Sequence, residues 1–157
     1  MSKTIQKITP FLWFESHAEE AVNFYLSIFK NSRIVNTTQY GDGAPQPKGS
    51  VMTISFELEG QKFMAINGGP YVKFNDAISF VVNCDTQAEI DEFWKRLTDG
   101  GQEVQCGWLK DKYGVTWQIV PSILGELLTS GDSAKSQRVM AALMQMIKLD
   151  IETLRTA

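Results

Sequence analysis

Few side chains in this 157-residue sequence have types that catalyse reactions, and none is flanked by the partners that catalysis would require. His17 is the single histidine, and it directly follows Ser16 at an expected helix start, which favours a surface position over a general base. Cys106 would be a reactive thiol only if a neighbouring cation lowered its pKa, and Lys110 is the nearest candidate. We therefore assign no catalytic residue and expect Cys106 to be a small, half-buried apolar side chain.

Acidic and aromatic side chains also have an ordinary structural explanation. Glu15, Glu19 and Glu20 surround the same expected helix start, where carboxylates complement the helix dipole. Tryptophan could stack on an aromatic ligand, but three of the four tryptophans occupy positions that we expect in the core, namely Trp13, Trp94 and Trp117. Trp108 remains as the one tryptophan that we retain as a ligand-binding candidate.

Composition limits the classes of function. A hydrophobic content of 43% with 21% charged residues is typical of one folded globular domain, residues 1–157. The net charge of -3, without a basic block, gives no reason to expect nucleic acid. No apolar run is long enough to cross a membrane, and the N-terminus lacks the apolar stretch of a secretion signal. Cys84 and Cys106 form no CxxC pair, so we expect reduced thiols and a cytoplasmic protein.

One order of residue types occurs twice. The apolar segment 8–14 is matched by 77–83, Ser16 by Asp85 and Phe24 by Phe93, so that both residue pairs are 69 positions apart (85 minus 16, 93 minus 24). Each copy predicts a strand, a helix and three further strands. The first helix should begin with a capping box formed by Ser16 and Glu19.

This pattern predicts an α+β fold of two βαβββ modules, residues 5–70 and 71–121. The two modules should form a curved mixed sheet around a cleft. Residues 122–157 predict a helical C-terminal extension, with Asp132 or Ser133 capping its longer helix and Asp150 capping a last turn.

The sequence resembles the vicinal-oxygen-chelate superfamily, which includes glyoxalases, bleomycin and fosfomycin resistance proteins and extradiol dioxygenases. Within it, the chain is most similar to the PhnB-like branch. The resemblance rests on five segments, at 11–14, 18–25, 67–70, 77–80 and 106–118. Some members of this branch are labelled 3-demethylubiquinone 3-methyltransferases. This chain lacks the glycine-rich turn that a Rossmann-type methyltransferase places after its first strand.

The resemblance also implies where a metal would be bound, since metal-dependent members use His, Glu or Gln from the first and last strands of each module. Those positions here are Pro10, Met64, Ser79 and Gln118. Only the glutamine could ligate a hard divalent cation, and one ligand does not make a site. We therefore expect neither a metal nor another cofactor.

Strand alternation extends the four positions to a predicted cleft lining. With Trp108 added as the retained tryptophan, the predicted lining is Pro10, Leu12, Phe14, Lys62, Met64, Ile66, Ser79, Val81, Trp108, Thr116 and Gln118. The alternate set should form the core, and comprises Phe11, Trp13, Phe63, Phe80, Val82, Trp117 and Ile119. A mostly apolar lining with a few polar groups suits a small ligand, and it equally suits a filled interior without one.

The expected function is that of a PhnB-like protein which binds a small, partly apolar molecule in a metal-free cleft. The resemblance implies a homodimer, because related proteins often complete their clefts with strands from two chains. Two alternatives stay open: an enzyme, either a metal-dependent lyase or dioxygenase or the methyltransferase of the family label, and a pure interaction module.

Overall fold

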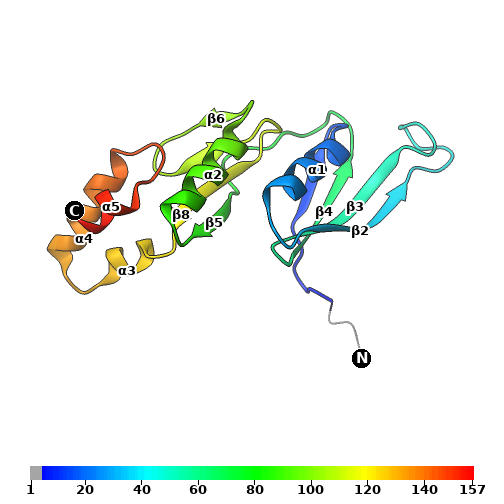
Figure 1. Ribbon diagram of the computed structural model, residues 1–157. Helices are drawn as coiled ribbons and strands as arrows, with labels where there is room; N and C mark the ends of the chain where they lie inside the picture. The colour runs from blue at the N-terminus through cyan, green and yellow to red at the C-terminus, as the bar shows by residue number, and fades with distance from the viewer. Residues whose placement is uncertain (1–4) are drawn as a thin grey trace. The chain divides into compact units, whose positions relative to one another are not determined.

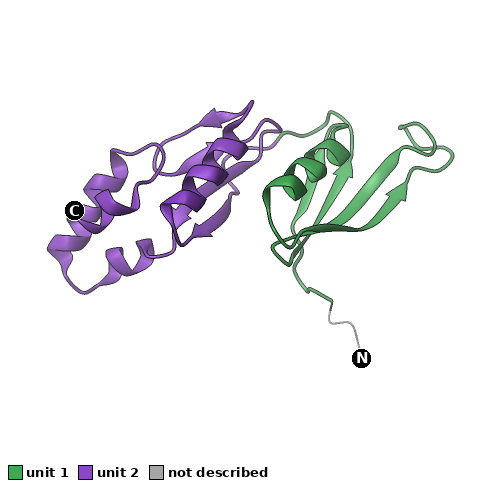
Figure 2. Cartoon of the chain, in the orientation of Figure 1, with its two compact units in different colours: residues 1–73 green, residues 74–157 purple. Residues whose placement is uncertain are grey.

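The computed structural model describes residues 5–157. Its first sheet consists of four strands and is accompanied by one helix (Figure 1). The elements are β1 (Phe11–Phe14), α1 (Ala18–Ile28), β2 (Arg33–Gln39), β3 (Val51–Leu58) and β4 (Gln61–Asn67). Their order in the sheet is β1-β4-β3-β2, with β1 parallel to β4 and the other pairs antiparallel. Residues 1–73, which contain this sheet, form the first of two compact units (Figure 2).

Alternation along the strands gives this sheet one buried face. Phe56 and Phe63 are directly paired neighbours on β3 and β4, and their rings stack with centroids 5.5 Å apart. Helix α1 packs against these two strands with Val22 and Tyr25 fully buried. The hairpin between β3 and β4 turns at Glu59 and Gly60, which both have positive φ, as a two-residue type I′ turn requires.

The start of α1 differs from the sequence prediction. The residue before the helix is His17, and neither its side chain nor that of Ser16 makes a capping hydrogen bond. The helix start is instead capped by Asn67 at the end of β4, whose Oδ1 accepts the Ala18 N–H at 2.8 Å. Glu19 accepts a bond from the Asn67 side-chain nitrogen at 2.6 Å and so orients the amide. The predicted capping box is therefore wrong, and the cap comes from a residue distant in sequence.

The second unit, residues 74–157, repeats the topology of the first. Its elements are β5 (Phe80–Cys84), α2 (Gln87–Thr98), β6 (Gln102–Glu103), β7 (Trp108–Lys110) and β8 (Thr116–Pro121). The sheet order is β5-β8-β7-β6, with β5 parallel to β8. Both expected βαβββ arrangements are thus present, as two four-stranded mixed sheets. Thr86 caps α2, since its Oγ1 accepts the Glu89 N–H at 3.2 Å.

A buried aspartate stabilises the turn between β7 and β8. Asp111 Oδ1 accepts the backbone N–H groups of Tyr113 and Val115, and its Oδ2 accepts the Trp117 indole N–H at 2.9 Å. One side chain therefore closes the turn and positions a core tryptophan. This explains the Asp111–Gly114 segment, which the sequence alone identified only as a turn.

Three helices form the C-terminal extension, α3 (Leu124–Thr129), α4 (Ser133–Met144) and α5 (Ile151–Arg155). Asp132 and Asp150 cap the last two, as predicted. Val139, Leu149 and Leu154 are buried together at the centre of the extension.

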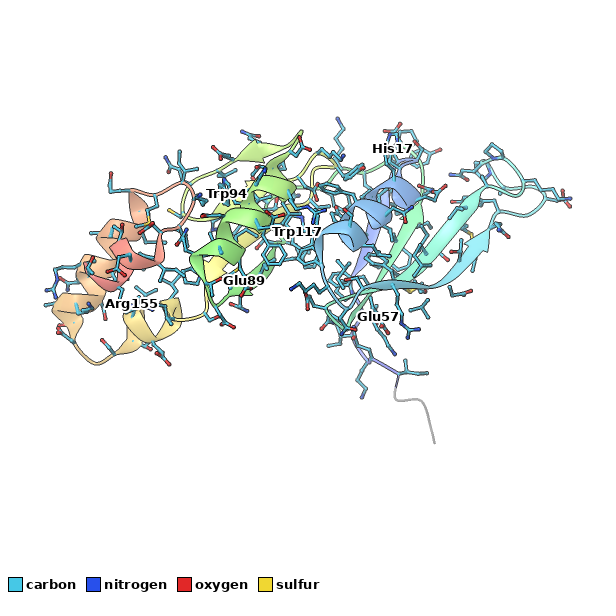
Figure 3. The ribbon with its side chains drawn as sticks, in the orientation of Figure 1. His17, Glu57, Glu89, Trp94, Trp117 and Arg155 are labelled. Atoms are coloured by element: carbon cyan, nitrogen blue, oxygen red, sulfur yellow. The ribbon has the colours of Figure 1, made fainter. Side chains whose placement is uncertain are left out.

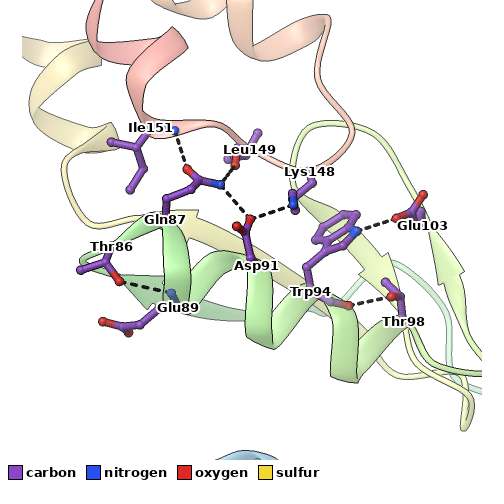
Figure 4. A network of polar contacts seen from close by, with 10 residues as sticks. All are labelled: Thr86, Gln87, Glu89, Asp91, Trp94, Thr98, Glu103, Lys148, Leu149 and Ile151. Atoms are coloured by element: carbon purple, nitrogen blue, oxygen red, sulfur yellow. Dashed lines mark hydrogen bonds and ion pairs between the residues drawn. The ribbon is translucent and has the colours of Figure 1, made fainter.

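Polar contacts connect the extension to α2 (Figure 4). The Gln87 amide donates to the Leu149 carbonyl at 3.0 Å and accepts the Ile151 N–H at 2.8 Å. Lys148 forms an ion pair with Asp91 at 2.7 Å. The extension is therefore an integral part of the second unit. In residues 5–157, no helix is both long and apolar enough to span a membrane.

Candidate functional site

The second sheet has an open face on which three predicted lining residues form a row. Val81 on β5 and Trp108 on β7 are both register partners of Gln118 on the central strand β8. Register partners point to the same side of a sheet, so the amide lies between an aliphatic and an aromatic side chain. Val81 is 51% exposed, and Trp108 and Gln118 are half-buried, which leaves the row accessible.

Two polar side chains in this row are joined to each other. Gln118 Nε2 donates to Ser79 Oγ at 2.9 Å. Among the described residues, the Gln118 amide oxygen accepts no hydrogen bond and the Trp108 indole N–H donates none. This part of the face therefore offers one acceptor and one donor beside apolar surface.

The neighbouring row holds an ion pair. Asp76 Oδ1 accepts the hydroxyl of Thr116 at 2.7 Å and lies 3.3 Å from Lys110 Nζ. The hydrogen bond from Thr116, followed by the one from Lys110, holds the pKa of Asp76 below its ordinary value. Asp76 thus stays ionised and neutralises the lysine. Sequence reasoning missed Asp76, because it precedes β5 in a loop and only the fold brings it to Thr116, 40 positions further along the chain.

For the second sheet, the predicted faces are correct. Ser79, Val81, Trp108, Thr116 and Gln118 belong to the open face, although the Thr116 side chain is buried beneath Asp76. The alternate positions lie on the other side, where Trp117 and Ile119 are buried. Trp94 and Trp117 are core residues, as expected (Figure 3).

For the first sheet, the prediction is right on β4 and wrong on β1. Leu12 and Phe14 are only 7% and 3% exposed, and they pair with Ala65 and Asn67 on the helix-covered face. Phe11, which we expected in the core, is 51% exposed and pairs with Met64.

Trp13 likewise pairs with Ile66 on the open face of the first sheet, where its indole N–H donates to the Gly69 carbonyl at 3.0 Å. Met64, Ile66 and Lys62 share this face, as predicted. Pro10 lies just before β1, half-buried, and its carbonyl accepts the Met64 N–H at 2.9 Å.

A shift of one residue in the repeat explains the error. Val81 pairs with Gln118 as Phe11 pairs with Met64, so the first strands are 70 positions apart (81 minus 11), not 69. A slip of one residue moves every side chain of a strand to its other face.

The remaining candidates for chemistry have structural surroundings. His17 is exposed at the start of α1, 3.7 Å from the Glu20 carboxylate (Figure 3). Cys106 is half-buried, as expected, and its Sγ lies 3.8 Å from Met144 Sδ. Burial raises the pKa of the Cys84 thiol to about 12, with smaller contributions from the carboxylates of Glu89 and Asp85. Cys84 is therefore an inert core thiol at neutral pH.

Comparison with known structures finds the same fold in other proteins. PA1353 from Pseudomonas aeruginosa matches with a TM-score of 0.62 at 22% identity, covering 74% of this chain and 98% of that chain. The fosfomycin resistance protein FosX from Listeria monocytogenes, complexed with Mn(II) and sulfate, matches with a TM-score of 0.55 at 15% identity. That match covers 83% of this chain and 99% of FosX. At such identities, both likenesses show the fold alone.

The chain belongs to the family described as 3-demethylubiquinone-9 3-methyltransferase, whose profile matches residues 6–120. The PhnB protein from Bacillus cereus, which bears the same description, is 41% identical with a TM-score of 0.68. The match covers 74% of this chain and 99% of PhnB. No protein of curated function matches the chain.

The manganese ion in FosX raises the question whether the residues here suit a metal. The open faces present Met64, Ser79 and Gln118 at the positions considered above, beside Phe11 and Val81. A thioether and a neutral hydroxyl are poor ligands for a hard cation, and the side-chain nitrogen of Gln118 already donates to Ser79. Within residues 5–157, no three His, Cys, Asp or Glu side chains are grouped so that they could hold an ion. These residues therefore do not fit a divalent metal.

Proposed function

We propose that this PhnB-like protein binds a small, partly apolar molecule on the open face of its second sheet, β5-β8-β7-β6. The observation that carries the proposal is the accessible row of Val81, Gln118 and Trp108. An unpaired amide oxygen and an indole N–H beside apolar surface are the few oriented polar groups that small-molecule sites use.

The proposal is tested by screening small aromatic and aliphatic amides, alcohols and acids for their effect on the melting temperature. Binding should raise the melting temperature of the wild type, and Gln118→Leu should remove most of the gain. Gln137→Leu, an exposed glutamine on α4, is the matched control and should respond like the wild type. The proposal would be contradicted if no compound raised the melting temperature of the wild type by more than it raised that of Gln118→Leu.

The family description makes methyl transfer the rival function. A methyltransferase of the Rossmann type binds its cofactor at a glycine-rich turn after the first strand. Here β1 continues into α1 through Glu15, Ser16 and His17, which include no glycine. Calorimetric titration with S-adenosylmethionine decides between the two, because saturable binding would restore the methyltransferase and replace our proposal.

We further propose that the protein is a homodimer. The supporting observation is that β1 and β5 are both edge strands with exposed apolar side chains on them or beside them, Phe11 on β1 and Ile78 just before β5. Open strand edges with apolar surface favour pairing with another strand. For the compartment we propose the cytoplasm, in agreement with two free cysteines, one of them a deeply buried thiol.

A further inference from the structure

The open face of the second sheet has a charge pattern that bears on which ligands it accepts. Lys110 is the one charged side chain that strands β5, β7 and β8 contribute to this face within the described chain. The other contributed side chains are uncharged, and comprise Val81, Asn83, Trp108, Thr116, Gln118 and Val120. A free lysine in this place would make the face a receptor for anions.

Asp76 removes that possibility. Its carboxylate lies 3.3 Å from Lys110 Nζ and accepts the hydroxyl hydrogen of Thr116 at 2.7 Å. The Lys110 side chain is only 33% exposed, so its charge is directed at the carboxylate more than at solvent. Because the pair carries no net charge, a carboxylate or a cationic ligand gains no net Coulomb attraction from it and still loses hydration on binding.

The adjacent row fits an uncharged planar group. Val81, Gln118 and Trp108 lie on three consecutive strands, so the row spans two strand spacings, about 10 Å. An aromatic ring has this scale and can pack on Val81 and the indole. The Gln118 amide oxygen and the indole N–H then meet a ligand donor and a ligand acceptor.

Building on the proposed function, we infer that this face selects uncharged aromatic ligands that carry both a hydrogen-bond donor and an acceptor, and that the Asp76–Lys110 pair excludes their anionic and cationic isosteres. Benzamide, benzoate and benzamidine test this directly, because the three share one ring and one shape but differ in charge at neutral pH. Their affinities are expected to be on the order of millimolar, as is usual for ligands of this size.

The full-length protein is titrated with each compound while the four tryptophan indole N–H resonances are followed by NMR. The Trp108 signal is identified by its loss in Trp108→Phe. Benzamide should shift this signal, and it should bind about fivefold more tightly than benzoate or benzamidine, the scale of one partly exposed charge interaction. Equal affinities of the three compounds would overturn the inference and leave ligand binding itself intact.

A matched pair of variants isolates the cause. Asp76→Asn keeps a hydrogen-bond acceptor for Thr116 but releases the charge of Lys110, so the preference for benzamide over benzoate should largely disappear. Asp91→Asn is the control, because Asp91 also pairs with a lysine, Lys148, and accepts one side-chain hydrogen bond, from Gln87, away from this face. It should keep the wild-type preference.

Three results would overturn the inference or its basis. An unchanged benzoate affinity in Asp76→Asn would show that the ion pair does not select against anions. If Asp91→Asn also lost the preference for benzamide over benzoate, any change in the net charge of the protein would be enough to remove the preference, and the Asp76–Lys110 pair would not be its specific cause. If none of the three compounds moves the Trp108 signal while the other indole signals confirm a folded protein, the proposed binding function fails together with the inference.

Discussion

Asn67 makes more structural contacts than its place at the end of a strand indicates. Its buried amide accepts the Ala18 N–H and donates to Glu19 and to the Val51 carbonyl at 3.1 Å. One side chain therefore joins the start of α1 to strands β3 and β4. A helix cap supplied from a distant strand couples the helix to the sheet.

Asn67→Ala should consequently lower the free energy of unfolding by about 2–3 kcal/mol, the sum of a lost cap and unpaired buried groups. Ser16→Ala should change it by less than about 0.5 kcal/mol, since Ser16 is exposed and caps nothing. Urea unfolding followed by circular dichroism measures both. A larger loss in Ser16→Ala than in Asn67→Ala would restore the capping box.

Cys84 gives a prediction about pH. Its pKa in the folded protein is about 12, raised mainly by burial from an ordinary 9.0. Above pH 9 the unfolded chain releases this proton while the folded chain keeps it, so folding stability should fall as pH rises from 9 toward 12. Lysines and tyrosines titrate in this pH range too. The quantity to compare is therefore the slope of the free energy of unfolding against pH, in the wild type and in Cys84→Ala. The variant should show the shallower slope between pH 9 and 10.5, and identical slopes would refute the assignment.

At the scale of elements, the sequence predicted local features better than registers. Asp132 and Asp150 are helix caps in the structure as in the prediction, because a cap and its helix are adjacent in sequence. The faces of β1 were predicted wrongly, because every residue of this strand is apolar. Its two faces therefore look alike in the sequence, and a register shift of one residue goes unnoticed. Phe11 and Phe14 are equally apolar, and only the pairing with β4 decides which is buried.

In the candidate site, too, features set by local sequence were predicted, and contacts between distant segments were not. Val81 and Gln118 were predictable from the repeat and strand alternation, whereas Trp108 was retained because the other three tryptophans were expected in the core. Asp76 was not, because a carboxylate in a loop has no periodicity, and its partners Lys110 and Thr116 are far away in the sequence.

The C-terminal extension depends on one side chain of α2 for its last helix. Gln87→Ala removes the acceptor of the Ile151 N–H and the donor to the Leu149 carbonyl. We expect hydrogen exchange at the Ile151 amide to accelerate at least tenfold, which corresponds to about 1.4 kcal/mol of local stability. Glu92→Ala, on the same helix but in an exposed pair with Arg96, is the control and should leave that rate unchanged. Equal exchange in both variants would mean that Gln87 does not hold the extension.

At the scale of the whole molecule, this chain adds the extension to what its family shares. The family profile ends at residue 120, and PhnB from Bacillus cereus is covered almost completely by 74% of this chain. The extension closes over Gly107, where a Cβ atom would come within 2.9 Å of the Leu149 side chain. The family core and the added helices are thus packed together within the second unit.

Assembly supplies the last prediction. Phe11 on the edge strand β1 and Ile78 just before the edge strand β5 are exposed apolar residues in the part that the family shares. If a second copy covers them, the wild type should sediment with twice the 17.6 kDa mass of one chain, and Phe11→Asp should shift it toward the monomer. Met144→Asp introduces the same charge at an exposed apolar position of the extension and should leave the dimer intact. A wild type that is monomeric at every concentration measured would contradict the homodimer.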